Sequence, residues 1–165
     1  MTSLTLRQLG PDDLDAYRAL RLAGILEAPA AFCTTHAAES AVPLERMRQR
    51  LVHTAYQRMF GAFHDGRLVG CAALSREPIA LIHDRANIWG VYVAPGARGG
   101  GLARQLMHAC MAHAAATGEL RTLTLSVRRG NDVAEALYAR LGFAVVGASD
   151  DGEQLRMAMA LPPRA

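Results

Sequence analysis

The chain has 165 residues, of which 51% are hydrophobic, so it is long and apolar enough to form a single domain, residues 1–165, around one core. Its 18 basic residues are all arginines and give a net charge of +3 without a dense basic block, which argues against nucleic acid as the main partner and excludes a Walker or Schiff-base lysine. No run of about 18 apolar residues and no signal-peptide pattern is present, so we expect a cytoplasmic protein that does not enter a membrane.

The first half of the chain predicts a short strand, two helices and a hairpin. The strand lies near residues 4–7, and a helix starts at Pro11 and runs to about Glu27. After an irregular stretch to Thr35, the apolar spacing of residues 43–55 predicts a second helix. The hairpin joins residues 59–64 to residues 67–74 through an Asp-Gly dipeptide, which two-residue hairpin turns prefer.

The second half predicts a central strand followed by alternating helices and strands. Residues 87–94 have no consistently polar face, which is typical of a strand buried on both sides. A helix then runs from the glycines near residue 100 to Gly118. A strand at 122–127, a helix at 131–141, two strands at 143–146 and 154–161 and a loose tail at 162–165 complete the chain. The order βααβββαβαββ indicates an α/β (α+β) fold, with a mixed, mostly antiparallel sheet of about seven strands flanked by four helices.

A glycine-rich segment lies where the central strand ends and a helix begins. Free backbone N–H groups, the positive end of the helix dipole and glycines that let a ligand approach make such a junction an anion site. The expected contribution of the dipole is only about 0.3–1 kcal/mol when exposed, so several hydrogen bonds must act together and a diphosphate is favoured. The Rossmann spacing fails, because Arg104 stands where a third Gly or Ala is required.

The segment resembles the acyl-CoA signature of the GNAT N-acetyltransferases, which is met by Arg98, Gly101 and Ala103. If the six positions 98–103 are considered alone, the alternative is a Gly-rich turn that only joins a strand to a helix. A second motif of the family follows in order, with an Asn that opens a helix, a Tyr seven residues later and a Leu-Gly-Phe closure. Its residues are Asn131, Ala134, Leu137, Tyr138, Leu141, Gly142 and Phe143.

The resemblance implies an acetyl-CoA site that includes the strand, the loop and the later helix. Its cofactor-binding residues are Val91, Tyr92, Val93, Arg98, Gly99, Gly100, Gly101, Leu102, Ala103, Arg104, Asn131 and Tyr138. The pantetheine arm would lie along the strand as an added strand, with a bulge at Gly90 making room and the N–H of Val91 stabilising the oxyanion. Arg128 and Arg129 are further candidates for the phosphates.

Tyr138 is the predicted catalytic residue, as the general acid that protonates the leaving sulfur. A phenol and a thiol have ordinary pKa values of about 10 and 8.5, which are close enough for this transfer. Without the resemblance, Tyr138 would be a packing aromatic and Asn131 a helix N-cap.

The general base is not identified by any motif, because no carboxylate lies on residues 87–91. Acids and a histidine elsewhere are candidates for a water-relayed base, although each is more often a surface group: Glu27, Glu39, Glu77, His83 and Asp84. Histidine spacing implies no metal site. Three cysteines, Cys33, Cys71 and Cys110, fit reduced, buried thiols, and nothing supports an acyl-cysteine role.

The sequence therefore predicts an acyltransferase that moves the acetyl group of acetyl-CoA to a primary amine, with a small-molecule acceptor preferred. A protein or peptide N-acetyltransferase and a non-catalytic acyl-CoA sensor are the alternatives. Dimerisation is compatible with the fold, but no residue pattern indicates it.

Overall fold

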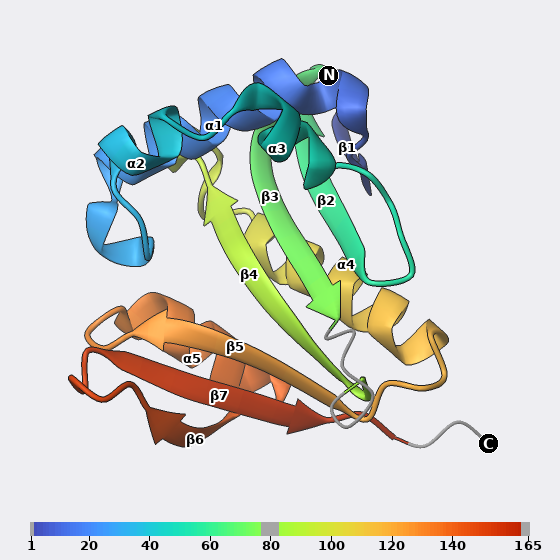
Figure 1. The fold of residues 1–165 in the computed structure, drawn as a ribbon, viewed down its shortest axis with the longest axis vertical. Coiled ribbons are helices and arrows are strands. Elements are labelled where there is room, and N and C mark those ends of the chain that lie inside the picture. The colour runs from blue at the N-terminus through green and yellow to red at the C-terminus, as the bar shows by residue number, and fades with distance from the viewer. Residues whose placement is uncertain (1, 77–82, 163–165) are drawn as a thin grey trace.

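The computed structural model describes residues 2–76 and 83–162, in which seven strands form one sheet in the order β1-β2-β3-β4-β5-β7-β6 (Figure 1). The strands are β1 Leu4–Gln8, β2 Gln57–His64, β3 Arg67–Arg76, β4 Arg85–Val93, β5 Thr122–Arg128, β6 Ala144–Ala148 and β7 Gln154–Ala160. The α-helices are α1 Leu14–Glu27, α2 His36–Ser40, α3 Leu44–Gln49, α4 Leu102–Ala116 and α5 Asp132–Leu141. Every neighbouring pair of strands is antiparallel except β4 and β5. The prediction of a mixed, mostly antiparallel sheet of seven strands is thus confirmed.

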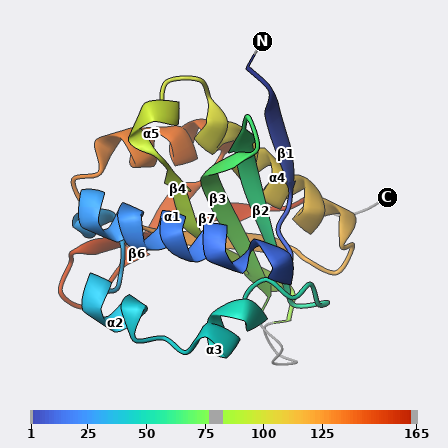
Figure 2. The ribbon, with the colours of Figure 1, turned by 90° about the horizontal axis from the view of Figure 1, so that it is seen from above.

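Helices cover the sheet on both faces, and each face has its own apolar core. On one face, α1 and α3 pack against the first four strands, as the view in Figure 2 shows, with Tyr17, Met47 and Tyr92 among the buried side chains. On the other face, α4 and α5 bury residues such as Leu106 and Tyr138 against strands from both halves of the sheet. The molecule therefore has a sheet between two helical layers.

The two halves of the sheet diverge between β4 and β5. The parallel pairing of these strands covers only Arg85–Asn87 of β4, and Figure 1 shows the two strands separating beyond it. In the pairing of β3 with β4, two residues of β4, Gly90 and Val91, stand opposite Ala72 alone. Gly90 has a φ of +64°, a left-handed conformation that glycine adopts without strain. The bulge expected at Gly90 is present, and it lies where the strands have separated.

The predicted hairpin is confirmed, with Asp65 at φ +50° and Gly66 at φ +79° joining β2 and β3. The helices were predicted less well, because residues 2–76 and 83–162 form five α-helices where four were expected. The short α2 was missed, although its N-cap Thr35 accepts a hydrogen bond from the backbone of Ala38, a capping pattern visible in the sequence.

The second predicted helix is shorter than its apolar spacing suggests. Instead of continuing to residue 55, α3 ends at Gln49. The side-chain amide of Gln57 donates hydrogen bonds to the carbonyls of Gln49 and Val52, so carbonyls that a longer helix would use are bonded to the start of β2. Of the predicted tail, 163–165 lie outside the described residues. Within the described ranges, no helix has the length and apolar character needed to span a membrane.

Candidate functional site

The loop between β4 and α4 presents a row of free backbone donors. Six consecutive N–H groups, from Gly99 to Arg104, donate to no protein acceptor in the described part of the chain. Gly99 and Gly101 have φ values of +88° and +78°, and no atom lies within 4 Å of the position that a Cβ would take at either. Left-handed residues beside a helix N-terminus turn successive N–H groups toward one point, which makes an anion-binding concavity.

Arg98, the first residue of the predicted signature, is directed away from these donors. Its guanidinium donates to both carboxylate oxygens of Glu27, at 2.9 and 2.8 Å, and to the carbonyl of Val93 at 3.0 Å. The backbone N–H of Arg98 donates to Pro95. Because of the hydrogen bonds from Arg98 and Tyr92, the pKa of Glu27 lies below its ordinary value. Arg98 therefore ties the end of α1 to the end of β4.

A cleft opens where β4 and β5 separate. An inner cavity of about 80 Å³ is lined by Val91 of β4, Ser126 of β5, Tyr138 of α5 and the loop around Phe32. An outer cavity of about 580 Å³ adjoins it, and residues such as Phe32, Cys33 and Gln154 line both. The cleft thus joins residues from both faces of the sheet, beside the bulge of β4.

Tyr138 lies in this cleft, on the wall formed by α5. Only 8% of its surface is exposed, and its hydroxyl makes no hydrogen bond with any described residue. Its ring packs edge-on against Phe143 with the centroids 6.4 Å apart. Burial raises the pKa of Tyr138 to about 12. The phenol therefore keeps its proton over the whole neutral range.

Asn131 begins α5 and lines the same inner cavity. Its side-chain oxygen accepts a hydrogen bond from the backbone N–H of Ala134 at 3.4 Å, so it is the N-cap of the helix. The side-chain amide nitrogen is left for another acceptor. Asn131, Ala134 and Tyr138 lie on one face of α5, one and two turns apart, and all three line the cavity.

The other predicted cofactor residues fall into two groups. Val93 and Leu102 are buried in the core shared with α4, whereas the side chain of Tyr92 points to the opposite core and donates to Glu27 at 3.0 Å. The remainder follow the exposed loop and the first turn of α4: Gly99, Gly100, Gly101, Ala103 and Arg104. For the buried residues, only the backbone is positioned to serve a ligand.

None of the described candidates for the general base lines the cleft. Glu27 is bound to Arg98, and Glu39 is buried between Arg21 and Arg50. His83 and Asp84 lie before the start of β4, at the end where β4 and β5 are still paired, and Glu77 lies outside the described residues. No carboxylate is among the described residues that line either cavity.

Sequence reasoning missed several residues of the cleft, and it was wrong about one cysteine. Phe32, Ser126 and Gln154 belong to no motif, and only the fold brings them to the site. Cys71 and Cys110 are buried as expected, but Cys33 is exposed and its sulfur accepts a hydrogen bond from Gln154. Cys33 is exposed because it lies in the loop between α1 and α2, which covers the cleft rather than a core. Among the described residues, no group of three or more His, Cys, Asp or Glu side chains is placed to hold a metal.

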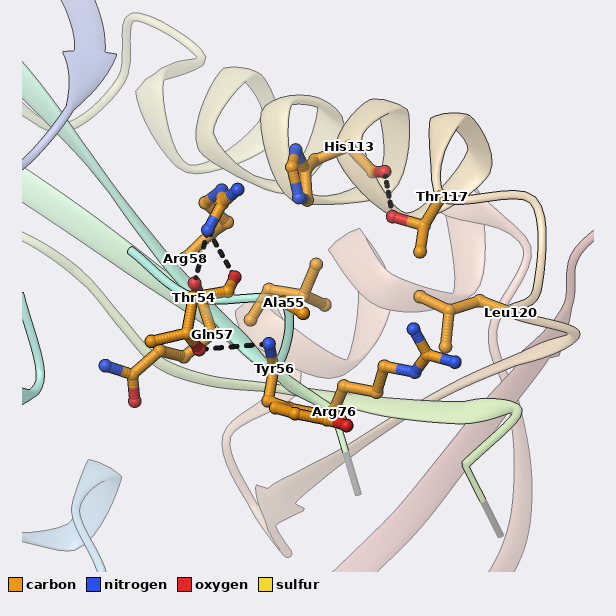
Figure 3. Close-up of a pocket in the computed structure, with 10 residues that line it drawn as sticks. Thr54, Ala55, Tyr56, Gln57, Arg58, Arg76, His113, Thr117 and Leu120 are labelled. Atoms are coloured by element: carbon orange, nitrogen blue, oxygen red, sulfur yellow. Dashed lines mark hydrogen bonds between the residues drawn. The ribbon is translucent and has the colours of Figure 1, made fainter. Parts of the chain in front are cut away.

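A separate hollow lies at the start of β2, between the turn before it and the end of α4 (Figure 3). Arg58 in this hollow donates to the carbonyls of Thr54 and Gln57, and Thr117 donates to the carbonyl of His113. Its volume is about 10 Å³, which is room for roughly one water molecule. The cleft between β4 and β5 is therefore the better candidate for a ligand site.

Comparison with known proteins agrees with this geometry. The profile of the Acetyltransferase (GNAT) family matches residues 24–143, which include the bulged strand, the loop of free donors and all of α5 with its Gly-Phe closure. The chain belongs to the GNAT acetyltransferase family. A Mycobacterium bovis protein described as an uncharacterized N-acetyltransferase is 41% identical over 87 residues, 52% of this chain and 52% of that protein. The chain thus matches about half the length of this curated relative.

Solved GNAT structures have the same fold. An acetyltransferase of the GNAT family from Streptococcus pneumoniae superposes with a TM-score of 0.81 at 20% identity, covering 97% of this chain and all of that one. The structure of yncA from Salmonella typhimurium, solved with its cofactor acetyl-CoA, gives a TM-score of 0.78 at 19% identity, covering 99% of this chain and 96% of that one. At these identities the likeness concerns the fold.

Proposed function

We propose that this GNAT protein transfers the acetyl group of acetyl-CoA to a primary amine of a small molecule, by direct attack in a ternary complex. The proposal depends on one observation, the position of β4 relative to the free N–H groups and to Tyr138. The strand that ends at six free N–H groups also holds Val91 of the bulge, which lines the same inner cavity as Tyr138, whose hydroxyl makes no hydrogen bond with the described residues. A phosphate site and a proton donor therefore lie at the two ends of one stretch of β4.

Acetyl-CoA fits the cleft by its chemistry. The N–H groups of residues 99–104 are donors for the pyrophosphate, and the separated edge of β4 can pair with the amide groups of the pantetheine arm. Gly90 and Val91 have no register partner on β3 or β5, so the N–H of Val91 is proposed as the donor to the thioester oxyanion. The yncA structure solved with acetyl-CoA supports this ligand.

The reaction needs one bond made, one bond broken and three proton movements. The amine nitrogen bonds to the thioester carbon, the carbon–sulfur bond breaks, and Tyr138 donates its proton to the sulfur. The nitrogen loses a proton to water, and the tyrosinate takes a proton back from water, which restores Tyr138. A tyrosine with a pKa of about 12 is a weak acid, but burial also raises the pKa of thiols. In this chain, burial raises the pKa of Cys71 to about 12. Partial burial of the leaving thiolate in the cleft would raise the pKa of its thiol in the same direction, toward that of Tyr138.

The inner cavity supports a small acceptor rather than a protein segment. The cavity has a volume of about 80 Å³, and the loop around Phe32 forms one of its walls. This leaves little room for an extended peptide backbone next to Val91. Because the lining contains no described carboxylate, the amine would enter as the free base.

The test is thiol release from acetyl-CoA with a panel of small amines, amino acids and peptides with free N-termini, with the N-acetyl product identified by mass spectrometry. We expect release with a subset of the small amines. Release with peptides alone would favour protein acetylation. Binding of acetyl-CoA without release for any acceptor would favour a sensor module and contradict the enzyme.

A further inference from the structure

The strands on the far side of the cleft carry a polar surface on the face opposite α4 and α5. Alternate residues of β5, such as Leu123 and Leu125, are buried under α4 and α5. The intervening residues therefore point to the other face. Strand register places their partners from β4 and β7 beside them. We call this surface the outer face, and it consists of Asn87, Thr124, Ser126, Arg128, Gln154 and Arg156.

The outer face is positively charged where it meets the cleft. Arg128 lines both cavities, whereas the guanidinium of Arg156 lies over Gly147 of β6, on the side of β7 away from the cleft. The described residues of the outer face and of the two cavities include no Asp or Glu. Two carboxylates lie near Arg128: Asp151, whose pKa the charge of Arg128 helps to lower, and Glu153, at 3.5 Å in a pair whose side chains are both more than 40% exposed. Such a long, exposed pair contributes little, so Arg128 has a free face toward the cleft.

Arg128 is poorly placed for the phosphates of acetyl-CoA, the other anion available. The loop with free N–H groups leads into α4, which covers the opposite face of the sheet. The guanidinium of Arg128 is instead on the face of the loop between α1 and α2, where the cleft opens to its larger cavity. An anion bound by Arg128 therefore enters through the larger cavity, where we expect the amine substrate to bind.

We propose that the acceptor is an amino acid whose free carboxylate is bound by Arg128 while its α-amine reaches the thioester beside Val91. This inference rests on the proposed function and specifies its substrate class. Val91 and Arg128 line one cavity of about 80 Å³, so an amine at Val91 and an anion at Arg128 would share one small space, which suits a compact molecule such as an α-amino acid. Ile25, Leu26 and Phe32 form an apolar wall of the larger cavity, which suits an aliphatic or aromatic side chain.

The arrangement also explains how an amine can react without a carboxylate base. The positive charge of Arg128 disfavours an ammonium in the empty cleft, so it favours entry of the neutral amine. The same charge discourages polyamines, which carry a second positive charge. Once the substrate is bound, its carboxylate offsets the charge of Arg128, so the arginine then serves to hold and orient the substrate.

The decisive experiment compares leucine, methionine and phenylalanine with their amides and with the amines that lack the carboxyl group. Rates of thiol release are divided by the concentration of unprotonated amine, because the pKa of the amine differs among the three compounds of each set. We expect kcat/KM for the amino acids to exceed that for both analogues at least tenfold, since a hydrogen bond to a charged group carries this discrimination. Arg128→Gln should remove the preference and leave the KM for acetyl-CoA unchanged.

Arg129→Gln is the matched control, because Arg129 is the next residue and donates to the carbonyl of Gly152 without lining either cavity. It should keep the preference. Equal rates for the amino acids and their analogues, or a preference for peptides, would overturn the inference while leaving the acetyltransferase proposal intact. A raised KM for acetyl-CoA in Arg128→Gln with unchanged acceptor preference would also overturn it. If no acceptor releases thiol, calorimetry with leucine and the acetyl-CoA complex decides, and absence of Arg128-dependent binding refutes the site.

Discussion

Glu27 at the end of α1 and Arg98 after β4 form a two-pronged ion pair, with both carboxylate oxygens bound to the guanidinium. Tyr92 donates to the same carboxylate, and Arg98 also donates to the carbonyl of Val93. The arrangement holds α1 against the end of β4, just before the loop of free N–H groups. We infer that Arg98 positions this loop and that the backbone beyond it binds the phosphates.

Arg98→Gln and Glu27→Gln should therefore have similar effects. Each removes the pair, and each should change the KM for acetyl-CoA by less than about fivefold, since exposed ion pairs contribute little. The double variant should be no worse than either single variant, because the two side chains act as one unit. A tenfold rise in KM for Arg98→Gln but not for Glu27→Gln would instead assign the guanidinium to the phosphates.

Gly101 should be far more sensitive than Arg98. Its φ of +78° is unfavourable for residues with a Cβ, by about 1–2 kcal/mol, and a Cβ would project into the space before the free N–H groups. Gly101→Ala should weaken coenzyme A binding about tenfold in calorimetry. Gly96→Ala is the control, because Gly96 has open space around it and no positive φ. Equal affinities for the two variants would contradict the proposed cradle.

The sequence was informative where a local rule decides the structure. The Asp-Gly turn, the bulge at Gly90 and the N-cap at Asn131 each depend on the conformational or hydrogen-bonding preference of one residue type. The end of α3 was not predictable in this way, because it depends on the side chain of Gln57, eight residues beyond Gln49.

The candidate site was predictable only on its donor side. The motif residues give the loop and Tyr138, but Phe32, Arg128 and Gln154 come from three separate segments that meet only in the folded chain. The pairing of Arg98 with Glu27 spans 71 residues and has no sequence signal. Long-range contacts of this kind decide whether an arginine forms an ion pair within the protein or binds a phosphate. Such contacts cannot be read from the sequence alone.

Tyr138→Phe should lower turnover about 100-fold or more and leave coenzyme A affinity nearly unchanged. The hydroxyl makes no hydrogen bond with the described residues, so its removal should have little effect on folding. With a pKa near 12, Tyr138 stays protonated in assays up to about pH 10, and activity should rise with pH as more acceptor amine becomes neutral. Tyr92→Phe is the control, since that hydroxyl points to Glu27. Unchanged turnover in Tyr138→Phe would show that Tyr138 only packs and is not the general acid.

Cys33 should be the only thiol that reacts rapidly with a disulfide reagent in the native protein. It is exposed and lines both cavities, whereas burial raises the pKa of Cys71 and Cys110 to about 12 and keeps them as thiols. Acetyl-CoA should slow the labelling because it occupies the inner cavity. The measurement is colorimetric thiol titration, with Cys33→Ser as the control. Labelling of two thiols at similar rates, or no protection by acetyl-CoA, would contradict the proposed position of the ligand.

Glu39 should be the most important charge for stability. It is 3% exposed and accepts hydrogen bonds from Arg21 at 2.7 Å and Arg50 at 2.6 Å. Burial alone would raise its pKa, but the hydrogen bonds from the two arginines outweigh burial, so the pKa lies below the ordinary 4.5. Breaking such a pair leaves partly buried cations without a partner, so Glu39→Gln should lower the free energy of unfolding by about 3 kcal/mol at pH 7.

The same pair should make stability depend on acid. Because the folded pKa of Glu39 is depressed, its contribution is complete above the unfolded value near 4.5 and is lost as the pH falls through the lower, folded value. The difference in unfolding free energy between the natural protein and Glu39→Gln should therefore shrink below about pH 4.5, as measured by urea denaturation at several pH values. Glu45→Gln is the control, because the Glu45 side chain is 72% exposed and its contact with Arg48 is 3.8 Å long. A pH-independent difference for Glu39→Gln would show that the loss comes from packing rather than from the ionised carboxylate.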